Sequence, residues 1–282
     1  MIESPVPVFV SVAELAGLLQ SNPGGVRLLE IRDESHGSAA AGPLDHLPGA
    51  VAVDLATELA RTDAPLTQGR RPLPRVEDLQ RAARRWGLRD NSTVIVYDDR
   101  GGLVAARAWW VLRWAGVARV GILEGGLRAW TAAGGTVGPA AEHITPGDVT
   151  LRAGQLPELD ADDAAALAAR HLLIDARAEE AYRAGHIPRS RNISSRDALA
   201  PDGTLRAGAE LRARYRVAAL DAPVPGMSCG GGVAGAFGVA VLAHLGFTAP
   251  LYVGSFSAWS ADPRRPIEAG PEPDLLPAER AR

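Results

Sequence analysis

The side chain best suited to covalent chemistry is Cys229, the only cysteine among 282 residues. A glycine-rich run follows it directly, and its members are Gly230, Gly231, Gly232, Val233, Ala234 and Gly235. Successive glycines can adopt positive φ, so several backbone N–H groups of such a run can point toward one atom. The positive end of a following helix would also stabilise an anionic sulfur there, as thiolate or as persulfide. We therefore predict that Cys229 is a catalytic nucleophile and that these six residues bind its substrate.

Other interpretations of the cysteine loop can be weighed from the same residues. A lone cysteine is often a small buried apolar residue, and glycines can serve only to make a tight turn. A non-catalytic module that binds a partner also stays open as an alternative. A phosphatase loop would need an arginine six residues beyond the cysteine to hold phosphate oxygens. Gly235 stands there, and no arginine lies between Cys229 and Pro263, which argues strongly against a phosphatase.

The cysteine loop lies between an expected strand and an expected helix. The residues before it, 224–228, end a run suited to a strand, and a helix pattern extends over about 233–245. In open α/β sheets, ligands bind at the carboxyl ends of the strands. The pattern therefore places Cys229 where such a sheet binds its ligand.

An earlier part of the chain repeats this order of elements. A β-rich run at 92–97 is followed by a turn that contains two glycines and by a helix pattern over about 103–115. Each copy then closes with a short strand and a tryptophan. Thirty residues separate Arg100 from Trp130, and thirty separate Cys229 from Trp259. The chain is therefore expected to contain an internal repeat.

The alternation of strands and helices predicts an α/β fold with two tandem domains, each a small parallel sheet with helices on both faces. A chain of this length can bury two separate cores. We expect an N-terminal domain at 1–138, a linker at 139–154 and a C-terminal domain at 155–282, because proline and glycine are frequent between the two copies.

Composition narrows the classes of function. The formal net charge is -3 and the arginines are scattered, so nucleic-acid binding is not expected. We expect no membrane segment and a cytoplasmic location, because no apolar run has the length of a membrane span and the N-terminus does not resemble a signal peptide. One cysteine supports neither an internal disulfide nor a cysteine cluster for a metal. The basic residues are all arginine, which excludes a lysine Schiff base.

Several short motifs, in a specific order, together carry a family resemblance. They are His46-Leu47-Pro48-Gly49-Ala50, Tyr97-Asp98-Asp99, Ala105-Ala106-Arg107-Ala108-Trp109-Trp110, Gly125-Gly126-Leu127-Arg128-Ala129-Trp130, Gly185-His186-Ile187-Pro188 and the Cys229 loop. Over roughly residues 8–268 the chain resembles the tandem-domain rhodanese family, the thiosulfate and 3-mercaptopyruvate sulfurtransferases.

This resemblance implies a sulfurtransferase whose Cys229 thiolate takes sulfur from a small-molecule donor. The sulfur is held as a persulfide and is then given to a thiol or cyanide acceptor. The family needs no metal and no organic cofactor, and its architecture can work as a monomer. It also implies an inactive N-terminal domain that forms one wall of the active-site cleft, with Asp99-Arg100 where the second copy has Ser228-Cys229.

The donor is left open between thiosulfate and 3-mercaptopyruvate. The run after Cys229 resembles the mercaptopyruvate type, but the arginine which that type places before an aromatic residue is replaced by Ala181. Arg183 is therefore expected as an alternative ligand for the donor anion. Ala56 and Arg71 stand where the mercaptopyruvate type has an Asp and a His, so no Ser-His-Asp relay is expected and Arg71 becomes a second anion ligand.

Overall fold

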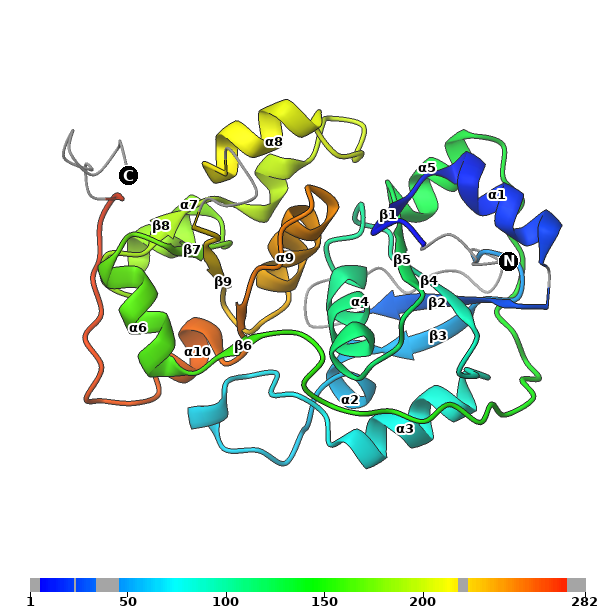
Figure 1. Ribbon diagram of the computed structural model, residues 1–282, viewed down its shortest axis with the longest axis horizontal. Coiled ribbons are helices and arrows are strands. Elements are labelled where there is room, and N and C mark those ends of the chain that lie inside the picture. Colours follow the sequence, from blue (N-terminus) through cyan, green and yellow to red (C-terminus); the bar gives the residue numbers. More distant parts are fainter. Residues whose placement is uncertain (1–5, 23, 34–45, 218–222, 273–282) are drawn as a thin grey trace.

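The structure is a computed structural model that describes residues 6–22, 24–33, 46–217 and 223–272. Two five-stranded sheets follow one another along the chain, and helices pack around both (Figure 1). Every strand pair within these sheets is parallel. This arrangement confirms the predicted α/β fold with two tandem domains.

The first sheet has the strand order β1-β5-β4-β2-β3. Its strands are β1 (Phe9–Val10), β2 (Val26–Arg32), β3 (Val51–Asp54), β4 (Thr93–Tyr97) and β5 (Val120–Leu123). Its helices are α1 (Val12–Ser21), α2 (Leu55–Glu58), the 3-10 helix η2 (Leu66–Gln68), α3 (Val76–Arg85), α4 (Ala105–Trp114) and α5 (Gly126–Ala132). Successive strand residues face opposite sides of a sheet. Leu29 and Val96 accordingly join the core with α3 and α4, whereas Leu28 and Ile95 join a second core with α1 and α5.

The second sheet repeats this topology, with the order β6-β10-β9-β7-β8. Its strands are β6 (Glu158–Leu159), β7 (Leu173–Asp175), β8 (Arg191–Asn192), β9 (Gly226–Ser228) and β10 (Leu251–Tyr252). Its helices are α6 (Ala161–Ala169), α7 (Glu179–Ala184), the 3-10 helix η3 (Ser195–Ala198), α8 (Gly208–Tyr215), α9 (Ala234–His244) and α10 (Ser255–Trp259). The predicted linker lies within residues 133–157, which contain no helix and no strand of either sheet. The exact domain boundaries stay a prediction.

The strand registers show which loop residues are equivalent in the two domains. Leu29 of β2 pairs with Val96 in the first sheet, and Ile174 of β7 pairs with Met227 in the second. Two residues beyond Val96 is Asp98, and two beyond Met227 is Cys229. The expectation that Arg100 takes the place of Cys229 is therefore wrong. That expectation rested on the equal spacing of Arg100 and Cys229 from the tryptophans that follow them. The first loop is two residues longer between its strand and its helix, so equal spacing does not give equivalent positions.

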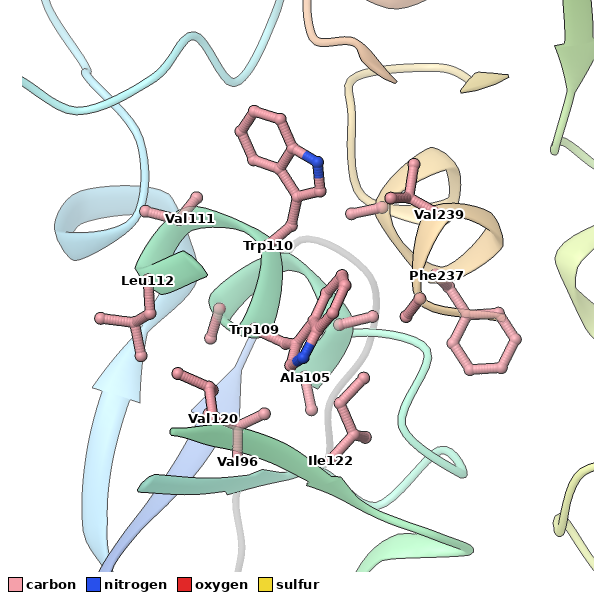
Figure 2. Packing of buried hydrophobic residues seen from close by; sticks show 14 of the residues in the cluster. Val96, Ala105, Trp109, Trp110, Val111, Leu112, Val120, Ile122, Phe237 and Val239 are labelled. Atoms are coloured by element: carbon pink, nitrogen blue, oxygen red, sulfur yellow. The ribbon is translucent and has the colours of Figure 1, made fainter. Parts of the chain in front are cut away.

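Helices α4 and α9, which follow the two loops, pack against each other where the domains meet (Figure 1). Figure 2 shows Ala105 and Trp109 of α4 between Val96, Val120 and Ile122 of the first sheet and the α9 side. At the same contact, the buried ring of Phe237 on α9 meets Phe9 edge-to-face, with 5.7 Å between centroids. One apolar core thus extends across both domains and holds them against each other.

In the part of the chain that the structure describes, no helix combines the length and the apolar character needed to cross a membrane.

Candidate active site

Cys229 directly follows β9, the central strand of the second sheet. Its Sγ accepts a hydrogen bond from the backbone N–H of Gly232, with an N···S distance of 3.0 Å. Ser255 Oγ lies 3.8 Å from the sulfur, accepts the N–H of Cys229 at 3.1 Å and donates to the Tyr252 carbonyl at 2.8 Å. Only 2% of Cys229 is exposed, so the thiol is held in one position at the bottom of its loop.

Ser255 itself has an unusual backbone conformation, with φ +51°. A non-glycine residue rarely adopts positive φ, and such residues cluster at functional sites. The hydroxyl contacts to Cys229 and Tyr252 hold this conformation, and the next two N–H groups bond the cysteine loop. Phe256 N–H donates to the Cys229 carbonyl at 2.9 Å, and Ser257 N–H donates to the Gly230 carbonyl at 3.0 Å. The start of α10 therefore fixes the shape of the loop.

The three glycines after Cys229 have different roles, which the sequence pattern did not separate. Only Gly232 has positive φ, +79°, and a Cβ there would lie 2.7 Å from the Val253 carbonyl oxygen. A Cβ at Gly230 would instead lie 3.1 Å from Nη2 of Arg70. The expectation of a cradle built by three positive-φ glycines is therefore wrong; Gly232 alone makes the turn.

Gly235 has a packing role at the start of α9. A Cβ at this position would lie 2.9 Å from Cδ1 of Leu251, so glycine allows α9 to approach β10 closely. The two preceding residues, Val233 and Ala234, face the space in front of the sulfur.

A cavity of about 300 Å³ opens in front of Cys229, and both domains line it. The C-terminal domain contributes the cysteine loop and residues near η3 and α7. Five arginines line the cavity, and they are Arg70, Arg71, Arg100, Arg177 and Arg196. No aspartate or glutamate is among its lining residues in the described part of the chain. The cavity is therefore strongly cationic and suits a small anion.

The two arginines predicted to bind the donor anion lie in different places. Arg71 lines the cavity with 8% of its surface exposed, and its Nη2 contacts both carboxylate oxygens of Asp33 at 2.7 and 2.8 Å. Arg183 is not among the lining residues: its side chain is 52% exposed on α7 and forms an ion pair with Glu179 at 2.7 Å. The structure thus brings Arg71 to the site and leaves Arg183 outside the cavity lining.

The other four arginines of the cavity were missed in the sequence, and their charges are not equally available. Arg177 is bound to Asp175 at 2.6 Å and stacks on Phe256. Arg100 lies 3.8 Å from Asp99. Arg70 and Arg196 have no ion-pair partner among the residues that the structure describes, so their positive charges face the cavity without an internal counter-ion. Arginines are spread over the whole sequence, and no local signal distinguishes these four.

A model of the family described as Rhodanese-like domain matches the chain twice, over residues 11–133 and 160–262. The chain belongs to this family. Each match contains four of the five strands of one parallel sheet, all but β1 and β6, and the two matches confirm the family resemblance read from the motifs.

Named relatives of this rhodanese-like chain are sulfurtransferases. SseB of Mycobacterium tuberculosis, named for thiosulfate sulfurtransferase activity, is 42% identical over 93% of this chain and 97% of its own. The 3-mercaptopyruvate sulfurtransferase of Escherichia coli is 33% identical over 79% of this chain and 83% of its own. The crystal structure of SseA from Escherichia coli, a 3-mercaptopyruvate sulfurtransferase, superposes with a TM-score of 0.76 at 29% identity, covering 89% of this chain and 99% of that one. The predicted enzyme class, a sulfurtransferase, is confirmed.

Arg107 is a further residue of the site that sequence reasoning missed. It lies on α4 of the first rhodanese-like domain and is fully buried. Its Nη2 donates to the Arg71 carbonyl at 2.9 Å, and its Nη1 lies 3.5 Å from the Gly232 carbonyl in the cysteine loop. Burial lowers the pKa of Arg107 to about 10, and the charge of Cys229 opposes this shift. An arginine with only alanine and tryptophan as its neighbours over two residues on either side was the available signal.

The loop of the first rhodanese-like domain is filled by one of its own side chains. Asp98 is 1% exposed and accepts four backbone N–H groups. The distances are 2.8 Å from Arg100, 2.8 Å from Gly102, 2.6 Å from Val104 and 2.8 Å from Ala105. A carboxylate thus occupies the position that the second domain gives to the thiol.

The histidines of the two His-x-Pro turns have structural partners. Nδ1 of His46 lies 2.7 Å from Glu30 Oε2, and Nδ1 of His186 lies 2.9 Å from the Tyr182 carbonyl. Among the residues described, no group of three or more His, Cys, Asp or Glu side chains could hold a metal ion.

Proposed function

We propose that this rhodanese-like chain moves a sulfur atom from 3-mercaptopyruvate or thiosulfate to a thiol or to cyanide, with Cys229 as the carrier. The observation that carries the proposal is the position of the Cys229 sulfur, bound by the Gly232 N–H at the bottom of an arginine-lined cavity. Relatives named for each of the two donors support the choice of substrates.

In the first half-reaction, the Cys229 thiolate attacks the transferable sulfur of the donor. An S–S bond forms on Cys229, and the bond between that sulfur and the rest of the donor breaks. The electron pair of the broken bond stays with the leaving group, which is sulfite when thiosulfate is the donor and the enolate of pyruvate when 3-mercaptopyruvate is the donor. The enolate then takes up a proton. Fixed arginines in the cavity favour this step, because they stabilise the negative charge that develops on the leaving group.

In the second half-reaction, the acceptor attacks the outer sulfur of the persulfide. The electron pair of the S–S bond returns to Cys229 as a thiolate, and the acceptor leaves as thiocyanate or as a new persulfide. The Gly232 N–H, which already bonds the sulfur, would stabilise the anionic sulfur in both states.

We further propose that the cysteine loop and Arg71 bind the donor. Gly230, Gly231, Val233 and Ala234 line the cavity with Arg71. Gly232 makes the turn of the loop, and Gly235 allows α9 to approach β10 closely. Arg183 has no place in this proposal because it lies outside the cavity lining. The acceptor, a monomeric state and a cytoplasmic location stay predictions.

Intact-mass spectrometry tests the function directly. Reduced wild-type protein is mixed with 3-mercaptopyruvate or with thiosulfate, and the mass is recorded after a single turnover. We expect the gain of one sulfur atom with at least one donor, its loss when cyanide is added, and no gain in Cys229→Ala. If the folded wild-type protein gains no sulfur from either donor, the proposal is wrong and a binding module becomes the better interpretation.

A further inference from the structure

We infer that Arg70, a residue of the N-terminal domain, selects the donor by binding its anionic group, and that Gly230 is glycine to make room for it. This inference rests on the proposed function and names a specificity-determining residue for its first half-reaction.

The first argument is the position of the Arg70 side chain on the cysteine loop. A Cβ at Gly230 would lie 3.1 Å from Arg70 Nη2, and a Cβ at Gly231 would lie 3.7 Å from Arg70 Cβ. The arginine therefore extends along the two residues that follow the nucleophile. Since neither glycine has positive φ, backbone conformation does not require glycine at these positions. Space for the guanidinium gives a physical reason for glycine at 230, whereas a Cβ at 231 would make only an ordinary van der Waals contact with Arg70.

The second argument is that the backbone of Arg70 is fixed. Its N–H donates to Ser257 Oγ at 3.0 Å, and the N–H of Ser257 donates to the Gly230 carbonyl at 3.0 Å. The preceding residue, Gly69, has φ +91°, and a Cβ there would lie 2.7 Å from the Gly254 carbonyl oxygen. The loop after η2 thus lies directly on α10. Ser257 connects this loop to the cysteine loop, so Arg70 is held at a defined place across the domain boundary.

The third argument is the charge of Arg70. Arg71 and Arg177 also line the cavity, but each contacts an aspartate, Asp33 and Asp175 respectively. Arg70 has no ion-pair partner in the described ranges of the chain, and no carboxylate there lines the cavity. An arginine presents a planar fork that matches a carboxylate or a sulfonate with two parallel hydrogen bonds. The donor class is therefore a small anion whose charged group lies beside the transferable sulfur.

The test separates the two half-reactions. Sulfur loading from thiosulfate and from 3-mercaptopyruvate is followed by rapid quench and intact mass, and discharge of the loaded protein is followed with dithiothreitol, an uncharged acceptor. In Arg70→Met we expect the second-order rate constant of loading to fall roughly 10- to 100-fold, as for loss of one charged hydrogen-bonded contact, with discharge unchanged. Arg70→Lys, which keeps the charge but not the fork, should lie between Arg70→Met and the wild type.

Two further variants keep the test specific. Gly230→Ala displaces only the far end of the Arg70 side chain, so it should slow loading in the same direction, and its effect should be much smaller when Arg70 is already Met. Arg128→Met removes an exposed arginine from α5 in the same domain, outside the cavity, and should load at the wild-type rate.

The outcomes distinguish this inference from the proposed function. If the wild type loads sulfur but Arg70→Met loads equally fast, or if loading and discharge slow to the same extent, the role of Arg70 is wrong while the sulfur transfer stands. If the folded wild type does not load at all, the proposed function fails and the role of Arg70 fails with it.

Discussion

Arg107 places a fully buried positive charge against the loop that carries the reactive sulfur. Its Nη groups bond backbone carbonyls, and its Nε has no hydrogen-bond partner among the described residues. Since the pKa of Arg107 is lowered only to about 10, the guanidinium stays protonated near neutral pH. Among the described residues no carboxylate forms an ion pair with Arg107, so its charge can favour the thiolate and the persulfide in the loop in front of it.

Replacing this charge should change the reactivity of the sulfur. In Arg107→Met, which keeps much of the side-chain volume, we expect Cys229 to react more slowly with iodoacetamide, because the anionic sulfur loses a nearby positive charge. Alkylation near pH 7 should slow about tenfold, corresponding to roughly 1.4 kcal/mol. The measurement is the alkylation rate at this pH, with near-ultraviolet circular dichroism to verify the fold. Arg107→Lys should return the rate toward that of the wild type; a folded Met variant that is alkylated at the wild-type rate would contradict the electrostatic role.

Single residues were predictable from sequence only where a local pattern defined them. Cys229 was found because it is unique and stands in a glycine-rich loop. Arg183 pairs with Glu179 four residues earlier on its own helix, a spacing that the sequence does show. The side chain of Arg70 instead takes its direction from a tertiary contact with the loop of the other domain. No sequence spacing reports such a contact between domains.

At the scale of elements, the strand-loop-helix unit is used twice with different loop contents. Asp98 satisfies four backbone N–H groups in the longer loop, whereas Cys229 receives one in the shorter loop. The expected helices at 103–115 and 233–245 agree closely with α4 and α9, because their apolar patterns are long. The two-residue difference between the loops was not predictable, since it appears only when strand register and helix start are compared.

Asp98 should therefore stabilise the first domain strongly. Asp98→Ala leaves several buried N–H groups without an acceptor, and each such group is costly. We expect the free energy of unfolding to fall by about 3 kcal/mol, measured by urea titration. Asp99→Ala is the matched control, because Asp99 is half-buried and makes only a 3.8 Å contact with Arg100; its change should stay within about 0.5 kcal/mol. Equal effects of the two substitutions would show that the four amide contacts contribute little.

At the scale of the whole molecule, the active site is complete only when the two domains are in contact. Arg70, Arg71, Arg100 and Arg107 come from the first domain, and the sulfur comes from the second. The α4–α9 core and the hydrogen bond from the Leu205 N–H to the Glu124 carboxylate, at 2.8 Å, hold this arrangement. The first domain is thus part of the site and not only a support for it.

Loosening the domain contact should affect catalysis as well as stability. Phe237→Ala removes a fully buried ring at the contact with Phe9 and should destabilise the protein by about 3–5 kcal/mol. Leu15→Ala, in the separate core under α1, should cost about 2–5 kcal/mol. Under conditions where both variants are folded, we expect sulfur loading to slow in Phe237→Ala alone. Equal loading rates in both would mean that the contact at Phe237 does not control the site.

The Asp98 loop also limits how the first domain could change during evolution. A single exchange of Asp98 for cysteine would put one sulfur where two carboxylate oxygens now bind four N–H groups, in a loop two residues longer than that of Cys229. The intermediate would lose stability before it gained a usable thiol. Return to a second catalytic centre therefore requires a deletion and a substitution together, and this makes the division of labour between the two halves hard to reverse.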